Sequence, residues 1–349
     1  MKYLKNAAAL ANCFVLMRQP LFRFSDIIYL YFLKATWVTC GFFVPKNREE
    51  NFMEVVSSIL MQSLILSIMV MGVYISYKIL DFPDMSADGS FTLGAAIVAV
   101  LLTKGVSPIT ASIVALIGGL VAGLLTGILN VKIKISNLLS GILVMGILYS
   151  FNLRIMGKAN IPIFSEKNIF YDFNPLVIML FIVILIKILI DLFLKTGLGY
   201  LLKGVGDNSQ MIKSLGIEVG KIKILGLMLS NGLIAFSGGI MAQYQGFSDA
   251  SMGIGTLILG IASIIIGISI IKRKSFIKET SMVIMGTIIY QGTIYLAMTL
   301  GLTTVDLKMI TSLIIIVFLA LREIDNKYEE KSWRWIKNVR NSKFIKKLS

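Results

Sequence analysis

Apolar runs long enough to cross a lipid bilayer recur along most of this chain, between residues 55 and 321. A transmembrane helix needs about 17 to 25 mostly apolar residues. The candidate helices are residues 55–80, 91–103 (short), 109–130, 137–156, 175–194, 224–244, 252–271, 279–300 and 305–321. The predicted fold class is therefore all-α: a polytopic transmembrane helix bundle of about eight or nine spans, one of them short or broken.

The composition supports this fold class and excludes several kinds of function. Hydrophobic residues make up 56% of the 349 residues, above the roughly 45–50% of soluble domains. The chain has no histidine, and its two cysteines are Cys13 and Cys40. Zinc sites, Ser-His-Asp triads and Cys-His pairs in the membrane core are thereby excluded or disfavoured. There is also no phosphate-binding G-x-x-x-x-G-K-[ST] loop, so we expect no catalytic residue, metal or cofactor in this chain.

Three regions differ in composition. Residues 1–52 form an atypical N-terminal extension without a clean span, residues 53–322 form the transmembrane domain, and residues 323–349 form a basic tail. Codons for Arg48, Glu49 and Glu50 can form a purine run that resembles a bacterial ribosome-binding site just before Met53. We therefore expect translation to start at Met53.

Lysines and arginines predict which side of the membrane each connection faces. Lys132 and Lys134, the segment 195–223, the segment 272–278 and the tail all fall on one side if each long segment crosses once. Cytoplasmic loops carry the excess of basic residues, so this side and the C-terminus are predicted to be cytoplasmic. The tail interleaves Trp333 and Trp335 with basic residues, a pattern that also suits anionic lipid headgroups, and nucleic acid is not an expected partner.

A faint internal repeat is visible. Asp84-Met85-Ser86 recurs as Asp249-Ala250-Ser251, and a small-residue helix follows each. Inverted repeats of this kind build many transporters. One interpretation makes residues 91–103 run opposite to residues 252–271, and the other makes residues 91–103 a re-entrant segment that starts on the cytoplasmic side.

The stretch DFPDMSADGSFTLGAA contains the first candidate site residues, Asp84, Ser86, Asp88 and Gly89. Aspartate and serine favour helix N-caps, so one interpretation is a capped helix that starts near Phe91 in a surface loop. The other is functional, because non-helical backbone at membrane depth persists only inside protein or beside water. On that interpretation these residues border a polar path.

Two further polar stretches lie on the opposite, outer side. LYSFNLRIMGKAN contains Asn152 and Arg154, and MAQYQGFSDASMG contains Gln243, Gln245 and Asp249. An arginine at this depth costs a few kcal/mol unless it is paired or reaches the interface. Asp249 is its candidate partner, and all five residues are candidates for the path or its outer gate.

The fourth stretch, GVGDNSQMIKSLGIEVGKIK, lies in the largest predicted cytoplasmic loop. Asp207, Asn208 or Ser209 can cap a short helix, and Gly216 can end it in the left-handed conformation. A capped helix of about two turns suits docking to a partner, although such turns also occur in loops without a role.

These four stretches resemble the permease subunits of bacterial ABC importers, in the branched-chain amino acid and ribose permease superfamily. The tryptophan and tyrosine branch is most similar, over about residues 53–322. The resemblance implies a multi-pass inner-membrane protein that pairs with a second permease copy, two ATPase subunits that bind the ATP, and an extracytoplasmic binding protein. The residues that match the ATPase-coupling loop are Gly206, Asp207, Asn208, Leu215, Gly216 and Ile217.

The chain is therefore expected to be an importer subunit that forms the translocation path and does not hydrolyse ATP itself. By family likeness the substrate is an aromatic amino acid or a similar small solute. An ion-coupled secondary transporter is the alternative, and Asp191 near the end of one span is its basis. A membrane enzyme or scaffold is the third interpretation, and it lacks the usual catalytic residues.

Overall fold

The computed structural model describes residues 49–171, 174–270 and 278–299, and the single positions 309, 312, 313, 316 and 320. Residues 53–311 form one compact unit, which is described by itself. Nearly all of the N-terminal extension, most of the segment 305–321 and the basic tail lie outside the described residues. The boundaries at 53 and 322 and the start at Met53 stay predictions.

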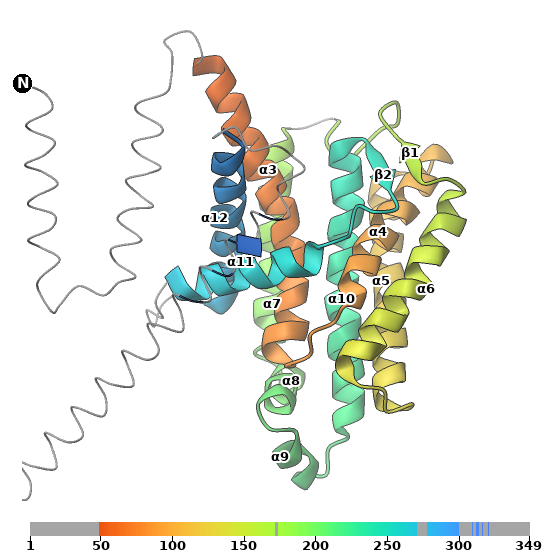
Figure 1. The fold of residues 1–349 in the computed structure, drawn as a ribbon, viewed down its shortest axis with the longest axis vertical. Helices are drawn as coiled ribbons and strands as arrows, with labels where there is room; N and C mark the ends of the chain where they lie inside the picture. Colours follow the sequence, from red (N-terminus) through yellow and green to blue (C-terminus); the bar gives the residue numbers. More distant parts are fainter. Residues whose placement is uncertain are drawn as a thin grey trace, which may run out of the picture. The chain divides into compact units, whose positions relative to one another are not determined.

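The described part of the chain is almost entirely helical (Figure 1). Its elements are α3 (Glu49–Val73), the π-helix η1 (Tyr74–Ile79), α4 (Ser86–Thr103), α5 (Pro108–Val131), α6 (Asn137–Met156), β1 (Asn160–Pro162), α7 (Pro175–Phe193), α8 (Gly197–Asp207), α9 (Ser209–Ser214), α10 (Val219–Gln245), β2 (Phe247–Asp249), α11 (Thr256–Ile270) and α12 (Glu279–Thr299). Within these residues seven helices are long and apolar enough to cross a membrane, and α11 is a shorter apolar helix. The predicted polytopic all-α bundle is confirmed.

The two ends of the bundle differ in chemistry. Figure 1 shows α8, α9 and the turn between α5 and α6 at one end, and the β1–β2 pair at the other. We call the first the lysine end, because Lys132, Lys134 and the lysines of the segment 195–223 belong to it, and the second the strand end. The sequence correctly grouped these two lysine-bearing segments on one side.

Helix α4 begins earlier than predicted, at Ser86 rather than near Phe91. The preceding loop, residues 80–85, connects the end of η1 to α4 (Figure 1). Leu80, Phe82 and Asp84 are buried in it. Gly89, one of the candidate site residues, lies inside this helix. The lack of a side chain at Gly89 lets α6 approach closely, because an added Cβ would lie 3.0 Å from the Cβ of Leu148.

Small residues hold the centre of the bundle together. A Cβ added to Gly94 of α4 would lie 1.8 Å from the carbonyl oxygen of Ala235 on α10. Likewise, a Cβ at Gly123 of α5 would lie 2.2 Å from the carbonyl oxygen of Leu227. Backbones therefore touch where side chains are missing, which is how helices associate in lipid without a hydrophobic driving force.

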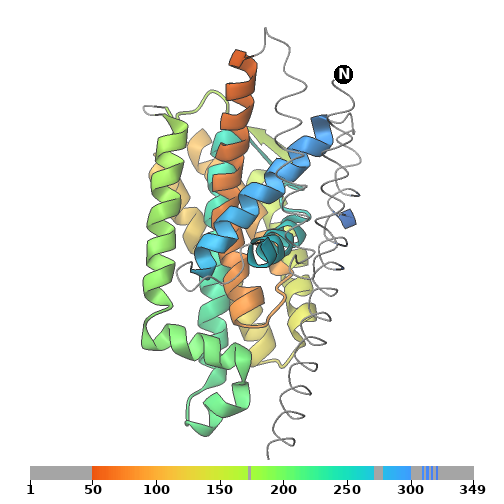
Figure 2. The same ribbon diagram turned by 90° about the vertical axis from the view of Figure 1, so that its left-hand side faces the viewer.

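The two copies of the predicted repeat, at Asp84 and at Asp249, form the same local turn. Ser86 N donates to Asp84 Oδ1 over 2.9 Å, and Ser251 N donates to Asp249 Oδ1 over 2.7 Å. The helices that follow do not run opposite to one another, however. Figures 1 and 2 show α11 lying across the direction of the other helices, which corrects the antiparallel arrangement that one interpretation of the sequence predicted.

Candidate functional site

The buried carboxylate of Asp84 is the centre of a polar network inside the bundle. It is 0% exposed. Its Oδ1 accepts hydrogen bonds from the backbone N and hydroxyl of Ser86, at 2.9 and 2.6 Å, and its Oδ2 accepts one from Asn231 Nδ2 at 2.7 Å. Buried polar groups require such partners, so this network fixes the entry to α4 against α10.

Two more helices meet the same turn. Thr126 on α5 donates to the Ser86 hydroxyl over 3.1 Å. Gly141 on α6 packs so closely that an added Cβ would lie 2.6 Å from Met85 N and 3.0 Å from Asp84 Oδ1. The end of the loop 80–85 is therefore packed against α5, α6 and α10, and its buried polar groups find their partners inside the protein.

Asp88 connects the start of α4 to the start of α11. Its Oδ1 accepts from Leu257 N at 2.8 Å and from the Thr256 hydroxyl at 3.0 Å, and its Oδ2 accepts from Gly255 N at 2.9 Å. A carboxylate stabilises the unpaired N–H groups and the positive dipole at a helix N-terminus. Asp88 thus caps a helix about 170 residues away in sequence rather than its own.

The two outer polar stretches come together at the strand end. Strand β1 pairs with β2 in antiparallel register, Asn160 opposite Asp249 and Pro162 opposite Phe247. Asn160 Nδ2 also donates to Asp249 Oδ2 over 3.4 Å. The sequence placed these stretches on the same side, and the structure makes them direct neighbours.

Gln243, on α10, joins α5 to the segment between β1 and α7, which we call the outer loop. Its Nε2 donates to the Ser112 hydroxyl on α5 over 2.8 Å, and its Oε1 accepts from Ile169 N at 3.2 Å. Asn152 on α6 donates to the carbonyl of Gly89 over 3.2 Å, and Gln245 is the half-buried last residue of α10. Gln243 and Asn152 therefore hold elements together, at the strand end and against α4.

Arg154 does not pair with Asp249, contrary to the sequence prediction. Its side chain is exposed on α6, and no ion pair to it is found in the described part of the chain. Asp249 instead accepts from the hydroxyl and backbone N of Ser251. These hydrogen bonds lower the pKa of the Asp249 carboxyl below its ordinary value, because they favour the ionised form.

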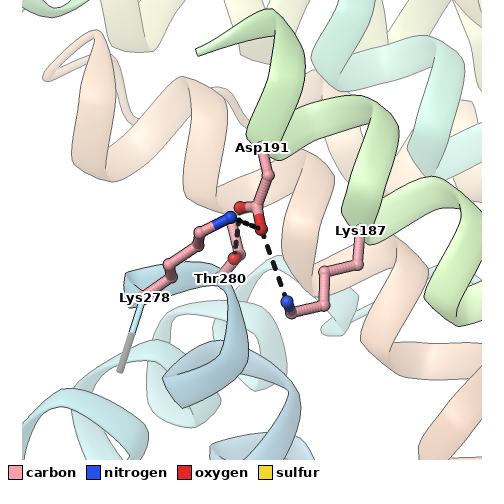
Figure 3. A network of polar contacts seen from close by, with 4 residues as sticks. All are labelled: Lys187, Asp191, Lys278 and Thr280. Carbon is pink, nitrogen blue, oxygen red and sulfur yellow. Dashed lines mark hydrogen bonds and ion pairs between the residues drawn. The ribbon is translucent and has the colours of Figure 1, made fainter. Parts of the chain in front are cut away.

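Asp191 on α7 is engaged by groups from two helices (Figure 3). Lys278 Nζ lies 2.9 Å and Lys187 Nζ 3.4 Å from Asp191 Oδ2, and the Thr280 hydroxyl donates to Oδ1 over 2.6 Å. The carboxyl side chain is 8% exposed. Because two ammonium groups and a hydroxyl occupy this carboxylate, it joins α7 to the start of α12, which argues against a free ion-carrying carboxylate there.

The predicted short helix at the lysine end is present. Asn208 caps α9 by accepting from the backbone N of Gln210 and Met211, each at 3.1 Å, and Gly216 has a φ of +76°. The helix α8, which precedes it, was not predicted. Met211 in α9 and Leu215, the residue that follows α9, are 61% and 62% exposed, and we call these two side chains the exposed apolar face of α9.

Sequence reasoning missed Asn231, Thr126, Lys278 and Thr280. A polar residue inside an apolar run was the available signal for Asn231 and Thr126, because such groups need partners when buried. No local pattern marked Lys278 and Thr280, whose contacts lie on α7.

Comparisons with known proteins agree with this architecture. A family model described as the branched-chain amino acid transport system permease component matches residues 55–320. The tyrosine transport system permease protein of Clostridioides difficile strain R20291 is 62% identical over 289 residues, which cover 82% of this chain and 98% of the relative. An uncharacterised protein of Rickettsia prowazekii strain Madrid E is 33% identical over 275 residues, 77% of this chain and 98% of the relative. No solved structure matches.

Proposed function

The chain belongs to the family of branched-chain amino acid transport system permease components, and from this premise we propose that it is the membrane-spanning subunit of an ABC importer. In this proposal two copies enclose the translocation path, and two separate ATPase subunits bind and hydrolyse ATP. A binding protein delivers the substrate from outside. The protein itself contributes a two-state packing of helices that ATP energy biases.

The observation that carries the proposal is the capped, exposed helix α9 at the lysine end of a transport-family bundle. Positive charge assigns this end to the cytoplasm, where an ATPase is available. The Asn208 cap stabilises the first turn of α9, and the exposed apolar side chains of Met211 and Leu215 are available for a partner surface. The matched coupling-loop residues, from Gly206 to Ile217, surround this helix.

At the strand end the proposal assigns the outer gate to the elements joined by β1 and β2. Gln243, Asn160 and Asp249 connect the outer loop to α10 and α5, so a binding protein that docks here acts on helices that reach the other end. Asp84 and Asp88 position α4 and α11 beside the path rather than contacting solute, because their oxygens are occupied by hydrogen bonds.

We propose tyrosine or a similar aromatic amino acid as the substrate. The support is the identity to a relative whose name states tyrosine transport, over nearly its whole length. A thermal-shift screen of the associated binding protein against the amino acids tests this proposal. Stabilisation by tyrosine is the expected result, and stabilisation by only sugars or nucleosides would overturn it.

The transport mechanism is tested by reconstitution. The permease is placed in liposomes with and without its ATPase subunit, and uptake of labelled tyrosine from the binding protein is measured. Uptake should require both the ATPase and ATP. Uptake by the permease alone, driven by a proton or sodium gradient, would establish the alternative secondary transporter.

A pair of surface variants tests docking at α9. Met211→Asp and Leu215→Asp place charge on the exposed apolar face without disturbing the Asn208 cap, so each should reduce co-purification of the ATPase. Ile133→Asp is the matched control, since Ile133 is equally exposed, at 60%, at the same end of the bundle. Equal retention of the ATPase by all three variants would remove the docking assignment.

A further inference from the structure

The helix that leads into α9 rests directly on the end of the π-helix η1. A Cβ added to Gly206 of α8 would lie 1.9 Å from the carbonyl oxygen of Ile79. Gly206 is followed after one residue by the Asn208 cap of α9. Because the contact is between backbones, no flexible side chain can absorb a displacement of α8 at this point.

Helix η1 is the least regular part of the first span. Six residues adopt π geometry, and Leu80 N continues this pattern by donating to Ile75 O, five residues back, over 3.1 Å. Phe82 N then donates to Ser76 O, six residues back, over 2.9 Å, so the chain widens by one residue after η1. π-Helical turns are rare and occur frequently at functional sites. The position of this turn, between the first span and the start of α4, therefore makes it a candidate functional segment.

The two sides of η1 are held differently. Its first residue, Tyr74, donates its hydroxyl to Glu279 Oε2 over 2.6 Å, which ties the start of η1 to α12. Its last residue precedes the loop 80–85, in which Leu80, Phe82 and Asp84 are buried and which ends at the Asp84 network and the start of α4. A push on Ile79 is therefore resisted at Tyr74 and transmitted toward Asp84.

We propose that Gly206 is a positioning residue that relays the movement of α9 through η1 to α4, and through Asp88 to α11. This relay rests on the proposed function, since it requires an ATPase that moves α9. It assigns to the π-helical turn the role of a movable link between the coupling segment and the loop 80–85. The path uses backbone contact at Ile79, then the loop 80–85, then the hydrogen bonds of Asp84 and Asp88.

The first experiment replaces Gly206 by alanine. The new Cβ forces α8 away from Ile79, so binding-protein-stimulated ATPase activity and uptake should fall by about tenfold, within the range of known coupling energies. The ATPase should still co-purify. The matched control is Gly197→Ala in the same helix, where an added Cβ meets nothing within 4 Å. Uptake by Gly206→Ala equal to that of Gly197→Ala would overturn the relay.

A second experiment does not depend on how well that variant folds. Lys78, exposed in the last turn of η1, is replaced by cysteine after Cys13 and Cys40 are changed to serine. Its labelling rate with a membrane-impermeant maleimide is compared between nucleotide-free and ADP-vanadate-trapped complexes. The relay predicts a difference of about fivefold or more, and equal rates would overturn it.

The two proposals fail in different ways. If the ATPase neither binds nor drives uptake, the proposed function fails. If ATP drives uptake normally while labelling at Lys78→Cys is insensitive to nucleotide, the importer stands and the relay through η1 fails.

Discussion

Asp84 shows how strongly a single residue can be constrained inside a membrane bundle. Its carboxylate accepts three hydrogen bonds, and the donors come from its own turn and from Asn231 on α10. Removing the carboxylate leaves these donors buried without an acceptor. An unpaired buried donor costs about 1–3 kcal/mol, more than the hydrogen bond itself contributes.

Asp84→Ala should therefore lower the thermal unfolding midpoint of the detergent-purified protein by several degrees, at about 2–4 °C per kcal/mol. Size-exclusion chromatography after heating measures this midpoint. Asp81→Asn is the control, because Asp81 lies in the same loop but is exposed, and asparagine tolerates its φ of +51°. Equal midpoints for the two variants would contradict the assignment of Asp84.

Asp249 gives a prediction about pH. Hydrogen bonds from Ser251 lower its pKa in the folded protein, so folding favours the ionised carboxylate. The resulting stabilisation is complete above the ordinary aspartate pKa of about 3.9, and it is lost as the pH falls through the lower folded-state pKa. Asp249→Asn removes this contribution, so its midpoint should depend less on pH in the acid range than that of the wild type.

The measurement for Asp249 is the thermal midpoint from about pH 3 to pH 7. Ser251→Ala is a partner variant that removes one of the hydrogen bonds and should produce a smaller change in the same direction. If the thermal midpoint of Asp249→Asn falls with decreasing pH as steeply as that of the wild type, the Asp249 carboxylate contributes no pH-dependent stability.

At the scale of the element, α9 is defined by its two ends. Asn208 supplies the N-cap and Gly216, with a φ of +76°, supplies the left-handed turn after the helix. A Cβ at Gly216 would meet nothing within 4 Å, so a substitution there disturbs the backbone conformation and no packing. A substitution at Gly216 therefore tests the conformation of the turn without changing the packing of the core.

Gly216→Val should abolish uptake and ATPase stimulation while membrane insertion and expression stay normal. A left-handed conformation costs an L-residue about 1–2 kcal/mol, and β-branching adds to this. Gly216→Asn is the control, since asparagine visits this conformation more readily. Wild-type uptake by the valine variant would show that the turn is not needed for coupling.

Other elements show why local signals are incomplete. The starts of α5 and α7 were predicted within one residue, because Ser107 and Asn174 cap them and a proline follows each cap. The start of α4 was predicted five residues too late. Its first backbone N is satisfied by Asp84 rather than by an N-cap side chain, and Gly89 is tolerated in it because α6 lies against it.

At the scale of the whole molecule, contacts between distant parts of the chain connect the helices. The Asp191 cluster joins α7 to α12 across 87 residues of sequence. Lys278 is half-exposed, so its ion pair with Asp191 is partly screened by solvent, whereas the carboxylate itself is nearly buried. The carboxylate is thus the shared partner on which the cluster depends.

Asp191→Asn should lower the thermal midpoint more than Lys187→Met or Lys278→Met. Each lysine variant leaves the other lysine and Thr280 to satisfy the carboxylate, while the asparagine variant removes the charge that both lysines face. The midpoint of the three purified variants is the measurement. A loss in Lys187→Met as large as that in Asp191→Asn would contradict the shared-partner arrangement.

The amino-acid sequence alone was enough to predict the all-α class, most span boundaries, the shared side of two lysine-bearing connections and the capped helix α9. These features depend on the transfer of a residue to lipid or on hydrogen bonds within a few residues, so they can be recognised locally. Four contacts could be recognised only in the folded chain: Asp88 caps α11, Asp84 accepts from Asn231, Asn160 pairs opposite Asp249, and Gly206 packs against Ile79. In each case the partner lies tens to hundreds of residues away in the sequence, and the two residues meet because the packing of the bundle brings their backbones close together.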